Sequence, residues 1–166
     1  MTATSMRNNA LILLLVSGGA LLAQPAAPAV EVAGAVRQPL KLSTTELAAL
    51  PRAAVETNND GIAVRYEGVW LHDVLKHAGV PAGEELRGPA MTGYVLVTAQ
   101  DGYQVLFSVA ELDPAFAGNT VLLADTANGK PLTGMEAPFR LVAPKERRGA
   151  RAARAVARIE VVMVRK

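Results

Sequence analysis

Apolar and polar residues alternate over short stretches along most of the chain, a pattern typical of strands with one buried face. Clusters of Gly, Pro, Asn and Asp separate these stretches. We expect strands at residues 30–36, 40–42, 54–57, 62–66, 93–99, 104–107, 121–124, 139–143 and 156–164. The turn-forming residues at 58–61 and at Asp101-Gly102 predict two β-hairpins.

Helical periodicity is confined to short segments. Residues 43–46 fit a capping box, in which Ser43 and Glu46 satisfy each other's free backbone amides, and Pro51 ends the helix that follows. Residues 71–78 place apolar side chains on one helix face, and residues 108–111 repeat the capping-box pattern. Helices this short do not build regular parallel crossovers. We therefore expect an α+β domain with a strand-dominated mixed sheet.

The first 29 residues have a different character. Arg7 is the only charged residue before Glu31, and it precedes an apolar run at residues 10–23. This order is typical of a secretory signal peptide, and the run is shorter than the roughly 20 residues of a membrane span. We expect cleavage after Ala23 or Ala29, with an uncleaved anchor as the alternative. The mature protein would then be periplasmic or secreted, with no transmembrane segment.

Residues 30–166 are the size of one domain. The chain contains no cysteine, which excludes disulfides, a lipoprotein anchor and any thiolate metal ligand. No Arg-Arg pair precedes the apolar run, which favours export in an unfolded state over the twin-arginine route.

Charge is unevenly distributed along the chain. Residues 140–166 hold nine basic and two acidic residues, a net charge of +7, whereas the rest of the chain sums to −5. Such asymmetry indicates that one region meets an anion. Exported proteins rarely meet nucleic acid, and no aromatic residues interleave these charges as single-strand binding requires. We therefore expect a small anionic ligand or an acidic protein partner.

The basic stretch at residues 145–158 lies between two expected strands. Its guanidinium groups, together with the Gly149 amide, are suited to hold an oxyanion, because arginine donates to phosphate in a bidentate manner. The alternative is a solvated loop with no ligand. His72 and His77 stand five residues apart, which is not the spacing that brings two imidazoles to one metal. We predict no catalytic residue and no metal ligand.

Five phrases of the sequence occur in the order of a known family. They read YEGVWLHDVL (66–75), DGY (101–103), NGKPL (128–132), PFRLVAP (138–144) and GARAAR (149–154). With them, residues 30–164 resemble the sulfite-oxidase-type molybdopterin-binding domain. The resemblance implies that family's fold, and it implies that the last two phrases help to hold the anionic tail of a pterin cofactor through Arg140, Arg151 and Arg154.

The candidate ligand-binding residues are therefore Arg140, Lys145, Arg147, Arg151 and Arg154. Catalytic members of the family ligate molybdenum through a cysteine ahead of the first phrase, where this chain reads Thr57-Asn58-Asn59-Asp60-Gly61. Without cysteine, no thiolate-ligated molybdenum is possible. The family's histidine before the PFRLVAP phrase is also replaced, by residues 134–137.

Three functions remain open on this basis. The first is an exported, non-catalytic binding or accessory module that holds a small anionic ligand or a partner. The second is a molybdopterin-dependent oxidoreductase domain in a periplasmic redox chain. The third is a structural interaction domain with a basic face.

Overall fold

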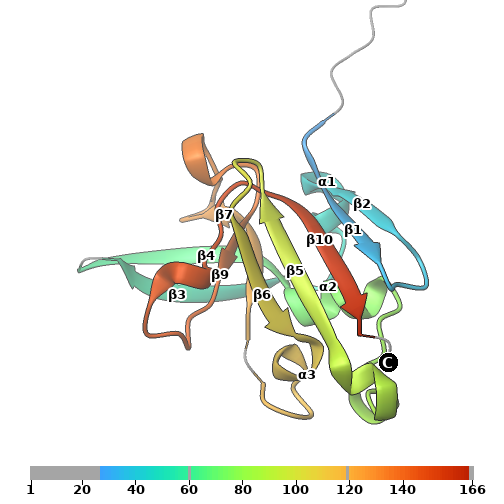
Figure 1. Cartoon of the computed structure of the whole chain (residues 1–166). Coiled ribbons are helices and arrows are strands. Elements are labelled where there is room, and N and C mark those ends of the chain that lie inside the picture. Colours follow the sequence, from blue (N-terminus) through green and yellow to red (C-terminus); the bar gives the residue numbers. More distant parts are fainter. Residues whose placement is uncertain (1–26, 60, 119, 165–166) are drawn as a thin grey trace, which may run out of the picture.

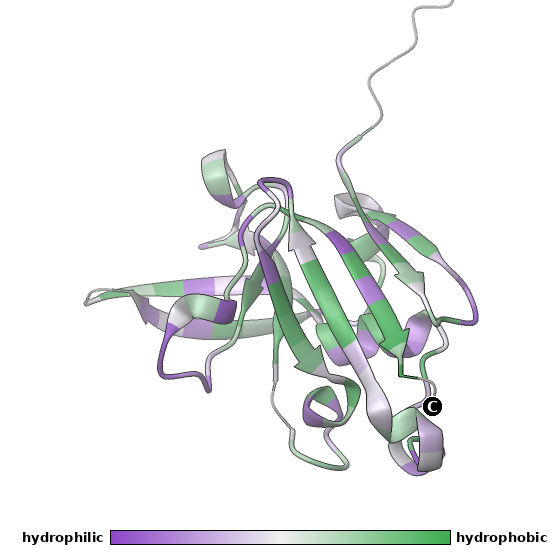
Figure 2. Ribbon diagram, in the orientation of Figure 1, coloured by the Kyte–Doolittle hydropathy of each residue, from purple (hydrophilic) through white to green (hydrophobic). Residues whose placement is uncertain are grey.

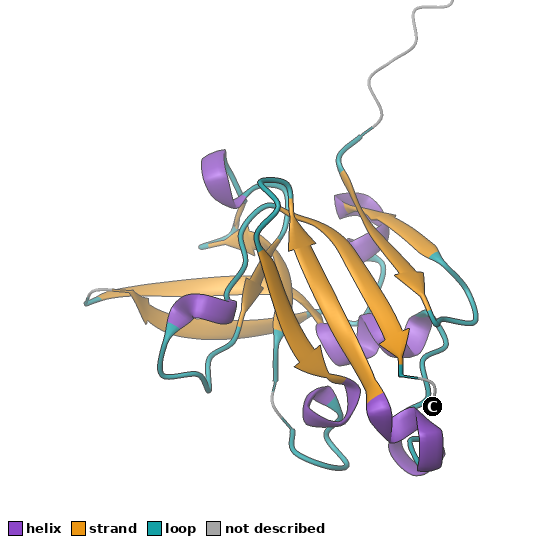
Figure 3. Ribbon diagram, viewed as in Figure 1, coloured by secondary structure: helices purple, strands orange, loops and turns teal. Residues whose placement is uncertain are grey.

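The computed structural model describes residues 27–59, 61–118 and 120–164, so most of the expected signal peptide lies outside the described residues. Within these ranges, strands dominate two sheets and the helices are short (Figure 3). The expected α+β fold class is confirmed. No described helix combines the length and the apolar character that crossing a membrane would require.

The first sheet has the strand order β2 (Leu40–Ser43), β1 (Ala29–Gly34), β10 (Val156–Met163), β5 (Gly93–Ala99) and β6 (Gln104–Ser108). Strands β1 and β10 pair in parallel, whereas the other neighbours are antiparallel (Figure 1). Buried and partly exposed residues alternate strictly along β5. Hydrophilic and hydrophobic residues also alternate along β10 (Figure 2). One face of this sheet therefore covers the core, as the sequence pattern predicts.

The second sheet contains β3 (Ala53–Asn59), β4 (Ile62–Trp70), β7 (Leu122–Ala127) and β8 (Lys130–Pro131), with β9 (Arg140–Val142) also paired to β7. Leu123 of β7 lies in the main core, whereas Leu122 belongs to a second apolar cluster. Strand β7 is therefore covered on both faces. Gly68 lies where a Cβ would be 2.0 Å from the Leu123 carbonyl oxygen, so only glycine permits this pairing of β4 with β7.

The helices α1 (Thr44–Ala48), α2 (Leu71–His77) and α3 (Val109–Leu112) lie close to the predicted positions. At α1 both capping-box hydrogen bonds are present. At α3 only half of the predicted box forms. The Glu111 amide donates to the Ser108 hydroxyl at 3.0 Å, but the Glu111 carboxylate instead accepts a hydrogen bond from Arg151.

Four 3-10 turns complete the described chain: η1 (Gly83–Glu85), η2 (Gly88–Thr92), η3 (Gly134–Glu136) and η4 (Gly149–Arg151). Turns η3 and η4 flank β9 in sequence, and η4 belongs to the loop that carries the basic stretch into β10. Arg140 is therefore the first residue of β9, whereas the other four candidate cations are carried by the irregular segment between β9 and β10.

Candidate functional site: a cationic recess

A polar recess of about 690 Å³ opens where four segments of the chain meet. Its lining includes Asn58 at the end of β3, Asp101 and Tyr103 in the β5–β6 turn, and Glu136 of η3. The remaining wall is formed by Ala99, by Arg140 of β9 and by six residues of the basic loop: Arg147, Gly149, Ala150, Ala152, Ala153 and Arg154. The volume is within the range of pockets that hold small ligands.

Backbone hydrogen bonds bring the end of the basic loop alongside β9. The Leu141 amide donates to the Ala153 carbonyl at 2.8 Å, and the Val156 amide donates to the Phe139 carbonyl at 2.8 Å. The Gln100 amide donates to the Ala155 carbonyl at 2.9 Å, which ties the same segment to the β5–β6 turn. Arg154 therefore lies on a segment that is fixed against both the β9 strand and the Asp101 turn.

Arg140 is buried, with only 7% of its surface exposed. One terminal nitrogen donates to the Tyr66 hydroxyl at 2.7 Å and to the Glu136 carboxylate, and the guanidinium lies 4.6 Å from the centre of the Tyr66 ring. Its Nε is also buried but has no hydrogen-bond partner. A buried donor without a partner is costly, and such groups in native proteins usually have a functional or ligand-related explanation.

Arg147 and Arg154 line the same recess from its exposed side. Among the described residues, neither guanidinium forms an ion pair with a carboxylate. Their charge is therefore available to a ligand. Of the five predicted cations, the fold thus brings three to one concave surface.

Arg151 does not line the recess. Its guanidinium bonds the Glu111 carboxylate at 2.8 Å and the Glu146 carboxylate at 2.6 Å, and it lies 4.4 Å from the centre of the Phe107 ring. Although burial opposes the charge, the hydrogen bonds to Glu146 and Glu111 raise the pKa of Arg151 above its ordinary value. Arg151 therefore holds the loop against β6 and α3.

Lys145 is also placed away from the recess, since its ammonium group donates to the Gly118 carbonyl at 2.6 Å. A third contact holds the loop from the other side, where the Tyr103 hydroxyl donates to the Ala150 carbonyl at 2.5 Å. Arg151, Lys145 and Tyr103 thus anchor the loop from which Arg147 and Arg154 face the recess.

Four polar lining residues were not among the predicted site residues: Asn58, Asp101, Tyr103 and Glu136. The sequence identified Asn58 and Asp101 as turn-forming residues, and each side chain does accept a backbone hydrogen bond within its turn. The Gly61 amide donates to the Asn58 side chain at 2.7 Å, and the Tyr103 amide donates to the Asp101 carboxylate at 2.9 Å. The DGY phrase was the available signal for Asp101 and Tyr103.

The recess suits an anionic group but not a thiolate-ligated metal. Arg140, Arg147 and Arg154 contribute three guanidinium groups to its lining, against the two carboxylates of Asp101 and Glu136. Asn58 lies in the segment that corresponds to the family's metal-binding cysteine, and an amide cannot supply a thiolate. Glu136 lies in the segment that replaces the family's histidine, and its carboxylate neutralises part of the Arg140 charge.

Comparison with known proteins agrees with the sequence phrases. Residues 57–166 match the family described as oxidoreductase molybdopterin binding domain. No curated protein matches the chain. Among solved structures, the sulfane dehydrogenase SoxCD from Paracoccus pantotrophus is similar, with a TM-score of 0.63 and 20% sequence identity. The match covers 81% of this chain and 38% of that chain, so this chain spans about two fifths of that protein's length.

Proposed function

The chain belongs to the oxidoreductase molybdopterin-binding domain family, and from this premise we propose that it is an exported, non-catalytic module that holds a small anionic ligand. The ligand would occupy the recess formed by Arg140, Arg147 and Arg154. The proposal includes a periplasmic or secreted location, which rests on the charge and apolar pattern of residues 1–29.

The observation that carries this proposal is that three guanidinium groups share one recess. Arg140, Arg147 and Arg154 all line it, and among the described residues neither Arg147 nor Arg154 forms an ion pair. An oxyanion in the recess would accept charge-assisted hydrogen bonds from these guanidinium groups. Charge-assisted hydrogen bonds of this type are about twice as strong as neutral ones.

The non-catalytic part of the proposal rests on the composition of the recess. The chain has no cysteine, and neither His72 nor His77 lines the recess. No group of three or more histidine or carboxylate side chains suited to a metal occurs among the described residues. In this proposal the domain retains arginines that would hold the anionic part of a cofactor, but it has no cysteine to ligate a metal.

Titration with pyrophosphate tests the proposal. In Arg154→Ala, we expect the affinity measured by calorimetry to fall by about 10- to 100-fold, because a hydrogen bond to a charged group contributes about 1.5–3 kcal/mol. Arg148→Ala is the matched control, since Arg148 is an exposed neighbour with the same charge that does not line the recess. Equal losses in the two variants would indicate only a general effect of charge, and unchanged binding in Arg154→Ala would refute the site.

A second function is supported by the family match itself, namely a molybdopterin-dependent oxidoreductase domain. Elemental analysis of the protein isolated from its native host distinguishes the two functions. The binding-module proposal predicts no stoichiometric molybdenum. One molybdenum atom per chain would replace it with the enzyme proposal.

A further inference from the structure

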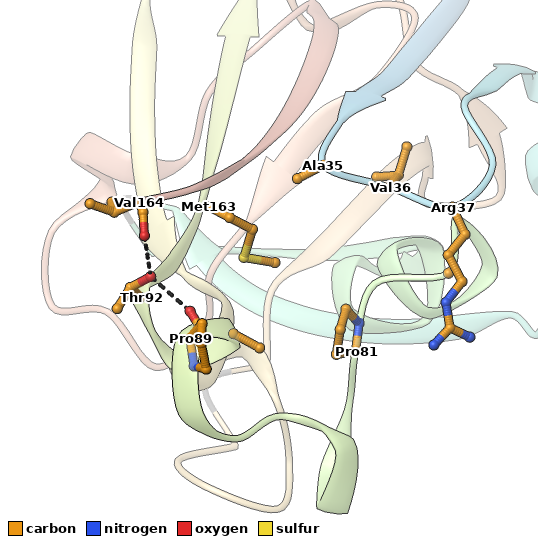
Figure 4. Close-up of a pocket in the computed structure, with 10 residues that line it drawn as sticks. Ala35, Val36, Arg37, Pro81, Pro89, Thr92, Met163 and Val164 are labelled. Carbon is orange, nitrogen blue, oxygen red and sulfur yellow. Dashed lines mark hydrogen bonds between the residues drawn. The ribbon is translucent and has the colours of Figure 1, made fainter. Parts of the chain in front are cut away.

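A second hollow lies elsewhere on the molecule and shares no lining residue with the recess. It has a volume of about 840 Å³ and is formed by the chain after β1, the exit of α2, turn η2 and the end of β10. We call it the apolar groove. Figure 4 shows Val36, Pro81, Pro89 and Met163 around it, with Arg37 at one side.

The polar groups of the groove differ in their availability. The Thr92 hydroxyl lies 2.8 Å from the Pro89 carbonyl oxygen and 3.1 Å from the Val164 carbonyl oxygen, so it is occupied by the wall itself (Figure 4). Arg37 has a side chain that is 74% exposed and a 3.5 Å contact with Glu85. Such an exposed ion pair is weak. Arg37 is therefore the one charged lining group that a ligand is able to recruit.

The position of Arg37 is built into the fold. A Cβ at Gly79 would lie 2.6 Å from the Arg37 Cβ, so the arginine stem rests directly on this glycine, whose φ is +79°. On the other side, Met163 lies over Gly93, where a Cβ would be 2.7 Å from the Met163 sulfur. Methionine adapts its shape to what it contacts. The groove thus combines an arginine whose stem is held against Gly79 with an adaptable apolar wall.

We propose that this groove binds an aliphatic carboxylate, with the alkyl chain against Val36, Pro89, Ala90 and Met163 and the carboxylate at Arg37. An apolar lining with one available cation is complementary to a chain that ends in a single negative charge.

The length of the ligand's alkyl chain provides the first test. Binding of octanoate, nonanoate and decanoate to the whole protein, each ligand below its critical micelle concentration, is measured by calorimetry. We expect the affinity to rise about fourfold with each added CH₂ group, which corresponds to about 0.8 kcal/mol per buried CH₂. An affinity that does not change along the series would overturn the proposal.

Two variants test the location. Val164→Trp places a large side chain at a groove position that is already 55% exposed, and Ala90→Trp places one on turn η2, which also lines the groove. We expect at least a tenfold loss of decanoate affinity in each variant that keeps its thermal unfolding transition. Normal decanoate binding in the folded Val164→Trp protein would contradict the site, even if Ala90→Trp does not fold.

The headgroup is tested by comparing decanoate with decanol. Arg37→Gln should weaken decanoate binding about threefold and leave decanol unchanged, because an exposed ion pair contributes little free energy. Arg87→Gln, an equal charge change outside the groove, is the control, and Glu85→Gln should strengthen decanoate binding by freeing Arg37. Equal effects of Arg37→Gln on both ligands would overturn the carboxylate assignment. Pyrophosphate binding at the recess should remain intact in all of these variants.

Discussion

The recess and the apolar groove have similar volumes but opposite linings. The recess is built largely from turns and a loop, and Asn58 and Asp101 reach it because they form those turns. Residues that form tight turns are polar, since their side chains hydrogen-bond to the local backbone. The groove is built from Pro, Ala, Val and Met where strands and a helix end. The backbone conformation that each wall adopts therefore decides whether the hollow is polar or apolar.

The largest expected effect comes from Arg140, which lines the recess but not the apolar groove. Arg140→Ala should lower the free energy of unfolding by about 3 kcal/mol, because it leaves the Tyr66 hydroxyl and the Glu136 carboxylate without their buried partner. Urea unfolding measures this loss. The folded variant should also lose pyrophosphate binding but keep decanoate binding. A loss of both ligands would show that the hollows are not independent.

Arg151 should give an intermediate effect. Arg151→Ala removes two carboxylate contacts and the contact with Phe107, so we expect a loss of about 1–2 kcal/mol in unfolding free energy. The affinity of the folded protein for pyrophosphate should fall less than in Arg154→Ala, because Arg151 positions the loop without lining the recess. A larger loss of affinity than in Arg154→Ala would make Arg151 a direct ligand.

The smallest expected effect comes from Asp113, which holds the segment between the groove residues Pro81 and Pro89. Asp113 accepts hydrogen bonds from the Gly83 amide at 2.6 Å and the Ala115 amide at 2.8 Å. Burial opposes its charge, but these two amides, with His72 and Lys76 nearby, lower the pKa of Asp113 below its ordinary value of 3.8. Its stabilisation is therefore present above the ordinary pKa and is lost as the pH falls through the lower folded pKa.

Asp113→Asn should lower the free energy of unfolding by about 1 kcal/mol at pH 7 and reduce the acid dependence of stability below the ordinary pKa of the carboxyl group. Decanoate affinity should fall slightly, because Gly83 lies in the segment between the groove residues Pro81 and Pro89. Pyrophosphate affinity should not change. An unaltered acid unfolding curve would show that Asp113 does not contribute this stabilisation.

Much of the local structure is readable from the sequence. The expected strands at residues 93–99 and 104–107 match β5 and β6 closely, because alternation and a strong turn fix both their faces and their ends. The capping box of α1 is likewise local, since Ser43 and Glu46 are three residues apart. Strand β8 was not among the expected strands, because two residues carry no periodicity.

The recess was only partly predictable, and its arginines show why. Arg151 and Arg154 belong to the same phrase and have the same charge, yet one is paired with Glu111 and the other lines the recess. The choice depends on a carboxylate that is forty positions away in the chain. The second predicted capping box forms only in part for the same reason, because the Glu111 carboxylate bonds Arg151 instead of the start of its own helix.

The sequence by itself determined the strands, the turns, the family and the absence of any thiolate, because each depends on residue types at short spacing or on composition alone. Only the tertiary structure decided which guanidinium groups face a common recess, and that an apolar groove lies beside Arg37. These features arise from contacts between residues far apart in the chain, and such contacts leave no periodic signal in the sequence.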